Sequence, residues 1–327
     1  MKKFLCAVML ALGCLSPHAG AQNHPAYGFL VGSDDYPRLI NHLVTFDLDT
    51  ELTTISDVMV YSDYTTAGDW VNGKYYVAGS KDASGGGEVA DKLMIFDIDN
   101  GTFSEVAPIT GLNRFINDMA YDNSRQKMYA VARLDLINSE SYHALYTIDL
   151  STGVATKIGT DLGRRISTLA CSYDGDLYAV DSYGTFCSID PLTGAVTEIG
   201  YTGTLPSGRQ SMTFDHTTGT LYWAAMHRRM GESMYMDVSE LRTIDVESGQ
   251  SFAVKSMGSN TQIAGLYIPY TAAASAAPAH VSQLIVTPAA DGANSATITW
   301  VNPSKLFGGG TLSSICLLYT SPSPRDS

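Results

Sequence analysis

Short runs of alternating hydrophobic and polar residues recur along most of the chain in a fixed order. In Ser211–Ala224, Met212 and Phe214 alternate with polar residues, a turn follows Asp215, and Leu221-Tyr-Trp begins a second run. Alternation with period two, interrupted by a glycine-containing turn, predicts a β-hairpin. Further copies of this hairpin begin at Thr66, Asn117 and Leu169.

A second pattern closes each unit: an aspartate at a strand end, followed by Thr, Asn or Ser and usually Gly. Its five copies carry Asp47, Asp97, Asp149, Asp190 and Asp245. Their spacing of roughly 40 to 55 residues is typical of four-stranded propeller blades. An aspartate at this position accepts backbone N–H groups of the turn while glycine takes the positive φ, so we predict a structural role for all five.

The two ends of the repeat region complement each other. Residues 27–58 supply a second, third and fourth strand without a first, and residues 262–269 supply a first strand with nothing after it. Joining them in one blade leaves no open sheet edge. We therefore predict an all-β fold, a five-bladed β-propeller over residues 22–270, closed by N-terminal strands pairing with a C-terminal strand. The alternative of six blades requires a further aspartate signature that the sequence lacks.

The net charge and the N-terminal residues limit the possible partners and the cellular location. The 327-residue chain has a net charge of −13, which argues against nucleic acid as a partner. Lys2-Lys3, an apolar run from Phe4 to Leu15 and Ala19-Gly-Ala21 predict a signal peptide over residues 1–21, and no transmembrane segment is expected after it. We expect export to the periplasm, the outer surface or the medium. Lipidation at Cys14 is an alternative fate of this segment.

The chain resembles known modules in two places. Phe214-Asp-His-Thr-Thr-Gly-Thr-Leu-Tyr-Trp and its copies resemble the blade motif of bacterial secreted propellers of the YVTN, NHL and YWTD groups. That resemblance implies a partner-binding propeller more than an enzyme. After a small-residue linker at 271–279, residues 280–315 resemble the first strands of a fibronectin type III module. Such a module runs to ~100 residues, so this one is incomplete.

The last residues have a different character. Cys316-Leu-Leu-Tyr-Thr-Ser-Pro-Ser-Pro-Arg-Asp resembles a translated sequencing adapter. We therefore interpret residues 316–327 as a non-native tail, with a natural Ser/Pro-rich terminus as the alternative. A C-terminal anchor or sorting signal would be lost with this truncation.

Long, dissimilar loops are predicted on one face of the propeller. They are Ser33–His42, Ser80–Lys92, Leu134–Ala144 and Met226–Glu240. Variable loops on a rigid scaffold are the usual place for recognition. The candidate ligand-binding residues on this face are Tyr36, Arg38, Arg114, Arg164, Arg165, Arg209, His227, Arg228 and Arg229. The same loops carry many carboxylates, so the face is mixed in charge, and salt bridges within the loops are the alternative use of these arginines.

Asp69 and Asp118 are the candidates for catalysis. Both fall on first strands, which line the axis of a propeller, and glycosidases work with paired carboxylates. Holding water or a cation is the other use of such groups. The histidines show no metal-ligand spacing, and we expect no metal and no cofactor. Cys171 and Cys187 fall on the first and third strands of one blade, too far apart for a disulfide, and are expected to be free thiols.

These observations favour an exported cell-surface or periplasmic propeller that binds a protein or a glycan through its long-loop face. A glycoside-active enzyme using Asp69 and Asp118 is the first alternative. A purely structural domain of a larger surface protein is the second. The sequence leaves the ligand and the oligomeric state open.

Overall fold

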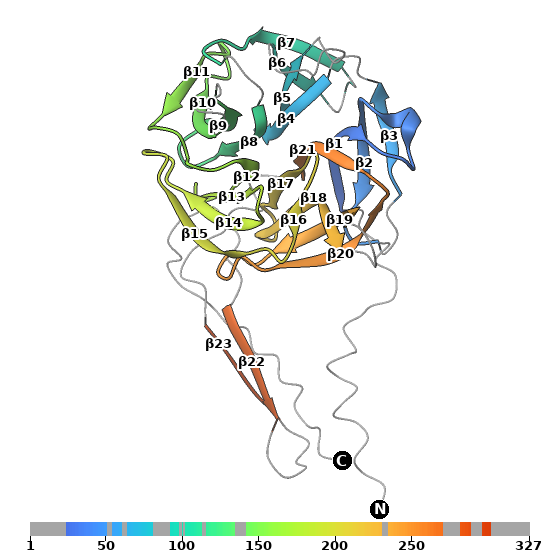
Figure 1. Ribbon diagram of the computed structural model, residues 1–327, viewed down its shortest axis with the longest axis vertical. Helices are drawn as coiled ribbons and strands as arrows, with labels where there is room; N and C mark the ends of the chain where they lie inside the picture. Colours follow the sequence, from blue (N-terminus) through green and yellow to red (C-terminus); the bar gives the residue numbers. More distant parts are fainter. Residues whose placement is uncertain are drawn as a thin grey trace, which may run out of the picture.

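The protein folds as a five-bladed β-propeller. The structure is a computed structural model that describes residues 24–50, 54–60, 64–80, 92–97, 100, 102–112, 116–134, 142–230, 235–270, 282–288 and 296–301. Five small antiparallel sheets surround a common axis (Figure 1). The predicted all-β architecture is confirmed, with five blades in the ring. The segments predicted as a signal peptide (1–21), a linker (271–279) and a non-native tail (316–327) lie outside the described residues.

Four blades follow one another along the chain, each with its strands in order from the axis outward. Blade 2 contains β4 (Tyr64–Val71), β5 (Lys74–Ser80), β6 (Lys92–Asp97) and β7 (Thr102–Pro108). Blade 3 contains β8 (Ile116–Asp122), β9 (Lys127–Arg133), β10 (His143–Ile148) and β11 (Ala155–Ile158). Blade 4 contains β12 (Ile166–Cys171), β13 (Leu177–Asp181), β14 (Thr185–Ile189) and β15 (Val196–Tyr201). Blade 5 contains β17 (Ser211–Asp215), β18 (Thr220–Met230), β19 (Tyr235–Ile244) and β20 (Ser251–Gly258), with the short β16 (Leu205–Pro206) paired to β18.

Blade 1 is assembled from both ends of the repeat region. It contains β21 (Gln262–Tyr267), β1 (Pro25–Gly32), β2 (His42–Asp47) and β3 (Ser56–Val60). The inner strand β21 pairs antiparallel with β1, with Tyr27 opposite Tyr267. The Tyr267 ring is stacked between those of Tyr27 and Trp70, with ring centroids 5.1 and 5.5 Å away. The predicted closure is confirmed, and it is reinforced by aromatic packing onto blade 2.

The inner strands all run in one direction, which gives the propeller two unlike faces. Each begins at what we call the loop face, where the connections within residues 33–41, 159–165, 182–184, 202–210 and 259–261 lie. Each ends at the turn face, which carries the tight turns at 123–126, 172–176 and 216–219 and those that follow the aspartates of the third strands. A short 3-10 helix, η1 (Pro37–Leu39), lies in the loop-face connection of blade 1.

The repeated aspartates lie at the turn face and bond to their own turns. One oxygen of Asp149 accepts the N–H groups of Ser151 and Thr152, at 2.9 Å each, and Gly153 follows with φ of 71°. Asp47, Asp190 and Asp245 repeat the pair of backbone hydrogen bonds, and Asp97 accepts the N–H of Asn100. Each carboxylate therefore accepts backbone N–H groups of its turn that have no other partner within the turn, and so stabilises the turn.

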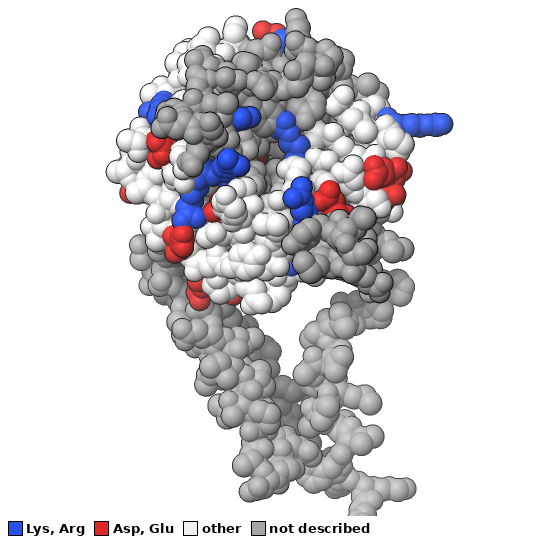
Figure 2. All heavy atoms as spheres, viewed as in Figure 1, with Lys and Arg blue, Asp and Glu red and all other residues white. Residues whose placement is uncertain are grey.

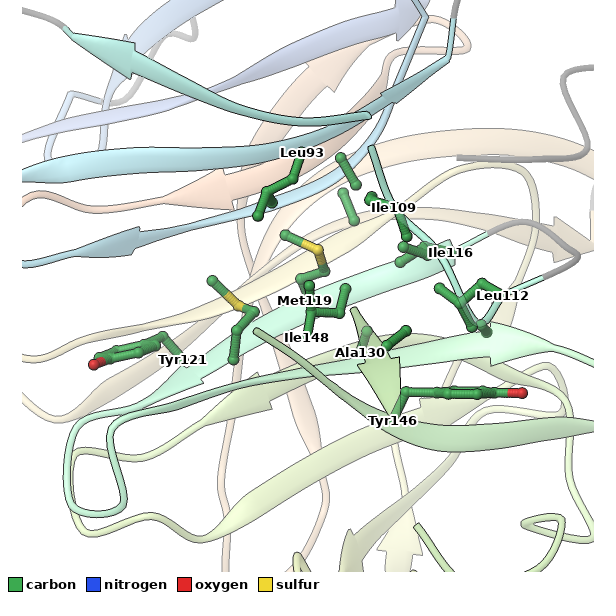
Figure 3. Close-up of a cluster of buried hydrophobic side chains, with 14 of the residues drawn as sticks. Leu93, Ile109, Leu112, Ile116, Met119, Tyr121, Ala130, Tyr146 and Ile148 are labelled. Carbon is green, nitrogen blue, oxygen red and sulfur yellow. The ribbon is translucent and has the colours of Figure 1, made fainter. Parts of the chain in front are cut away.

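The hydrophobic core lies between neighbouring blades. Figure 3 shows the layer between blades 2 and 3, where Leu93 of β6 lies above Met119 of β8 and Ile148 of β10. All three side chains are buried, as are Trp223 and Phe186 in the layer between blades 4 and 5. Each sheet buries its two faces against the neighbouring blades, so a single blade is not stable alone.

A buried lysine joins blade 5 to blade 1. The Nζ of Lys255 on β20 donates to the carbonyl oxygens of Asp47 and Thr50, in the turn after β2. Lys255→Met keeps the volume and leaves both carbonyls without this donor. We expect the free energy of unfolding to fall by about 1–3 kcal/mol, measured by urea denaturation. The matched control Lys157→Met, at an exposed position, should change it by less than about 0.5 kcal/mol.

Two further expectations have clear outcomes. Cys171 on β12 and Cys187 on β14 are free and buried, as predicted. The region Met226–Glu240, predicted as a loop, is mostly a continuation of β18 and β19, which pair from Leu221↔Ile244 to Met230↔Tyr235. Beyond the propeller, β22 (Ser282–Pro288) and β23 (Ala296–Val301) form a two-stranded antiparallel sheet in the segment that resembles a fibronectin module.

Candidate functional site

Asp118 is the most heavily bonded side chain at the axis. It lies on β8 of blade 3 with no accessible surface. Its carboxylate accepts hydrogen bonds from the Thr168 hydroxyl at 2.5 Å and the Leu169 N–H at 3.1 Å, both in blade 4. From blade 5 it accepts the Ser211 hydroxyl at 3.0 Å and the Met212 N–H at 3.4 Å. One carboxyl group therefore ties three blades together.

Asp69 makes a similar but sparser connection. It lies on β4 of blade 2, and its two oxygens accept the N–H of Trp70 at 2.7 Å and the N–H of Tyr121 at 2.6 Å. Tyr121 belongs to β8, so this bond joins blade 2 to blade 3. Asp69 retains some accessible surface, which Asp118 does not.

Two more hydrogen bonds complete a ring around the axis. The Ser211 hydroxyl, which donates to Asp118, accepts the N–H of Leu266 in blade 1 at 2.9 Å. The Tyr75 hydroxyl of blade 2 donates to the carbonyl of Gly265 in blade 1. Gly265 has φ of 58°, and a Cβ there would lie 2.3 Å from the Tyr75 hydroxyl, so only glycine permits this approach. Hydrogen bonds thus connect all five blades in a circuit.

Burial dominates the electrostatics of the two axial carboxyl groups. It raises the pKa of Asp118 to about 7, against the hydrogen bonds from Thr168, Leu169, Ser211 and Met119, which lower it. It raises the pKa of Asp69 to about 7 as well, against the two backbone hydrogen bonds. A pKa near neutrality suits a general acid, but such a group must also reach its substrate. In this structure no substrate atom can touch Asp118, because its oxygens face only protein donors.

Tyr270 closes the turn-face end of the axis. It follows β21, and its hydroxyl donates to Asn123 of blade 3 at 2.9 Å. Its ring lies edge-on to His216 of blade 5 and Tyr173 of blade 4, with ring centroids 4.5 and 6.1 Å away. Burial and the nearby Asp69 carboxylate raise the pKa of Tyr270. Asp69 and Tyr270 are therefore near neighbours at this end of the axis.

The loop-face candidates nearest blade 4 have different partners. Arg164 donates to Asp181 at 2.8 Å and to Glu198, so it is held in place by two carboxylates. Arg165, next in the chain, is exposed and makes no ion pair among the described residues. Arg209 is half-buried, and its backbone N–H donates to Gln262 at 2.8 Å.

Blade 5 hides one candidate and exposes another. His227 on β18 is buried, and its Nε2 lies 2.9 Å from Glu240 Oε2. Burial works to raise the pKa of Glu240, but the hydrogen bonds from His227 and Arg242 outweigh it and lower that pKa. Arg228 points outward with its guanidinium 3.7 Å from Asp237. The structure therefore brings His227 into an internal ionic network and leaves Arg228 accessible.

The remaining candidates lie on blade 1 or outside the description. Tyr36 is half-buried and packs against the core of blades 1 and 5 with Leu39. Arg38 is exposed on η1. Arg114 and the side chain of Arg229 lie outside the described residues. The structure thus spreads the described candidates over blades 1, 4 and 5.

Basic side chains nevertheless gather at the centre of the loop face. Figure 2 shows them around a central hollow, with acidic groups mostly further out. Arg133 at the end of β9 and Arg165 before β12 are exposed at this face. Both raise the local positive potential at the buried His143 between them. Burial, with a contribution from Arg133 and Arg165, lowers the pKa of His143 to about 4.

The comparisons with known proteins concern architecture alone. No protein-family profile matches the chain, and no curated protein matches it. A chain of the nidogen/laminin complex is similar at 9% identity and a TM-score of 0.47, over 76% of this chain and 98% of that one. TolB from Acinetobacter baumannii is similar at 13% identity and a TM-score of 0.41, over 88% and 62%.

A third similar structure is a Bacteroides thetaiotaomicron protein of unknown function. It has 16% identity and a TM-score of 0.38, over 65% of this chain and 55% of that one. None of the three indicates what this chain binds.

The described residues contain neither a metal-binding cluster nor a membrane-spanning helix. No three His, Cys, Asp or Glu side chains in that part of the chain gather closely enough to hold a metal ion. The same part contains no helix with the length and hydropathy to cross a membrane.

Several important residues escaped the sequence reasoning. Thr168, Ser211 and Tyr75 complete the axial circuit but look like ordinary strand residues, because their partners are far away in sequence. Tyr270 follows the last strand, where the repeat pattern has ended. For Asp69 and Asp118, in contrast, the sequence did carry a signal, since a carboxylate in an inner strand needs donors from neighbouring blades.

Proposed function

We propose that the protein is an exported, non-catalytic propeller that binds a partner through its loop face. The carrying observation is the contrast between the two faces. At the turn face, His24 before β1 is 3.4 Å from Asp215, and Tyr270 after β21 lies over the axis. Both ends of the ring are thus held on the turn face, whereas the described part of the loop face carries exposed arginines (Figure 2).

The charge pattern supports binding at this face. Arg38, Arg165 and Arg228 are exposed on it, and arginine binds carboxylates and sulfates with fixed geometry. Export rests on the leader-like residues 1–21 and on the resemblance to secreted propellers. The described part of the propeller ends with Tyr270 at the turn face, and a segment that resembles a fibronectin module follows in the sequence, which suits a spacer that presents the loop face outward.

Catalysis by Asp69 and Asp118 remains the alternative. The raised pKa of each carboxyl group, about 7, supports catalysis. The hydrogen bonds that both carboxyl groups accept from neighbouring blades argue against it. A passive structural domain is the second alternative, and it predicts no ligand for either face.

The test is a binding screen with face-specific variants. The mature chain is offered to a glycan array and a panel of extracellular proteins, and hits are measured by calorimetry. We expect the double variant Arg38→Ala/Arg228→Ala to weaken a hit about tenfold or more. Lys127→Ala, at an exposed turn-face position, should leave it unchanged. A hit indifferent to the loop-face variant would overturn the proposal, as would glycoside turnover that Asp69→Asn abolishes.

A further inference from the structure

Two tyrosines on blade 4 are the most exposed aromatic side chains among the described residues, followed by Phe252 of blade 5 at 51%. Tyr183 is 69% exposed and Tyr201 is 57% exposed. Tyr183 lies in the three-residue connection between β13 and β14, and Tyr201 ends β15, so both are at the loop face. A Cβ built on Gly184 would lie 2.8 Å from the Tyr201 ring, which places that ring against the backbone beside Tyr183.

The backbone beneath this tyrosine pair is held firmly. One oxygen of Asp181 accepts the N–H groups of Tyr183 and Thr185, each at 2.9 Å, and the other accepts Arg164. The N–H and the hydroxyl of Thr202, beside Tyr201, both donate to the Gly184 carbonyl at 2.9 Å. Aromatic side chains on an ordered backbone lose little conformational entropy on binding.

An arginine with no carboxylate partner among the described residues adjoins the pair. The carbonyl of Arg165 accepts the N–H of Ser182, directly before Tyr183, at 2.8 Å. The nearby carboxylates are already engaged: Asp181 and Glu198 by Arg164, and Asp161 by the N–H of Gly163. The Arg165 backbone thus adjoins the tyrosine pair, and its exposed side chain has no carboxylate partner among the described residues that would compete with an acidic ligand.

The chemistry of this patch fits a sugar chain better than a peptide. Peptide side chains gain most of their binding energy in pockets that exclude water, and these two rings stand on an open surface. A sugar ring can place its C–H face on the electron-rich face of an aromatic ring while its hydroxyls stay hydrated. A sugar carboxylate can be bound by both nitrogens of one guanidinium.

We propose that Tyr183, Tyr201 and Arg165 form a subsite for an acidic glycan chain, with sugar rings on the tyrosines and a uronate carboxylate on Arg165. The subsite rests on the proposed binding role of the loop face and names its ligand class. It lies on blade 4, where the connection between the second and third strands is only three residues long. The short connection leaves the tyrosines uncovered by their own blade.

The test is a calorimetric titration of the full chain with galacturonate oligosaccharides. We expect Tyr183→Ala and Tyr201→Ala each to weaken binding at least tenfold. Arg165→Ala should weaken it similarly and reduce its dependence on salt, and Arg165→Lys should restore part of it. Leu192→Ala is the matched control, since Leu192 is 70% exposed on the turn face of the same blade. Urea midpoints check that each variant is folded.

Several results would overturn the subsite. They are no binding of the galacturonate chain, equal binding of neutral dextran, equal competition by polyglutamate, or full binding by the tyrosine variants. Binding that survives these variants but is lost in Arg38→Ala/Arg228→Ala would refute the subsite and retain loop-face recognition. Binding indifferent to both sets of variants would refute the subsite and the proposed function together.

Discussion

Replacement of Asp118 by alanine is expected to lower the free energy of unfolding by about 3–5 kcal/mol. The substitution removes the acceptor for the hydroxyls of Thr168 and Ser211 and for the N–H of Leu169. These donors are buried at the axis. Without Asp118 each would be left without a hydrogen-bond partner and without water, which destabilises the folded state. Urea denaturation followed by far-ultraviolet circular dichroism measures the loss.

Two companion variants make this prediction specific. Asp118→Asn keeps the shape but puts an amide N–H₂ among donors, so we expect a loss of about 1–3 kcal/mol. Asp176→Ala, at an exposed turn-face position, should change stability by less than about 0.5 kcal/mol. A loss below about 1 kcal/mol for Asp118→Ala would show that the axial circuit contributes little to holding the blades together.

The axial circuit also bears on function. Ligands of a propeller are often sought at its axis, and the sequence directs attention there through Asp69 and Asp118. In the structure these groups join blades, and Tyr270 covers one end of the axis. The exposed arginines and tyrosines of the described residues lie on the loop face, on blades 1, 3, 4 and 5. This arrangement favours recognition at the loop face over reaction inside the axis.

Local sequence patterns were sufficient to predict the architecture. Each blade contains the same aspartate turn, and four of the five begin with the same hairpin, so the number of aspartate turns predicts the number of blades. Closure followed from the strand missing at one end and the strand left over at the other, and the pairing of β21 with β1 confirms it. These features can be predicted because each depends on a pattern that recurs along the chain, or on a strand that the recurring pattern leaves unmatched.

Contacts between residues far apart in the sequence could not be predicted in the same way. In β18, Met226 and His227 are both buried and Arg228 is exposed, so the alternation that identifies a strand is broken. The extra length of β18 and β19 depends on cross-strand pairing and on the bond between His227 and Glu240. Tyr183 and Tyr201 become neighbours only when β14 and β15 pair. No short segment of sequence carries that information.

The pH dependence of stability should reveal two pairs of titratable groups, one pair that lowers the free energy of unfolding as pH rises and one pair that raises it. Burial raises the pKa of Asp69 and Asp118 from 3.8 to about 7, so the folded state keeps protons that the unfolded state releases. Their contribution therefore falls as pH rises from about 4 to about 7. Burial lowers the pKa of His143 and His216 from 6.5 to about 4, so their contribution rises with pH between about 4 and 6.5.

Two aspartates and two histidines thus oppose each other, and we expect the wild-type free energy of unfolding to be nearly flat between about pH 4.5 and 6.5 and to fall above it. The turn aspartates act lower, as Asp149 shows, whose side-chain and backbone hydrogen bonds lower its pKa to about 2. Removing one partner should tilt the profile. His216→Phe, which keeps the packing against Tyr270, should lose stability with rising pH across this window by about 3 kcal/mol. Asp118→Asn should gain stability with rising pH. Urea denaturation at several pH values measures both slopes, and parallel profiles for the two variants would contradict the assignment, because the opposite signs follow from which group keeps its proton in the fold.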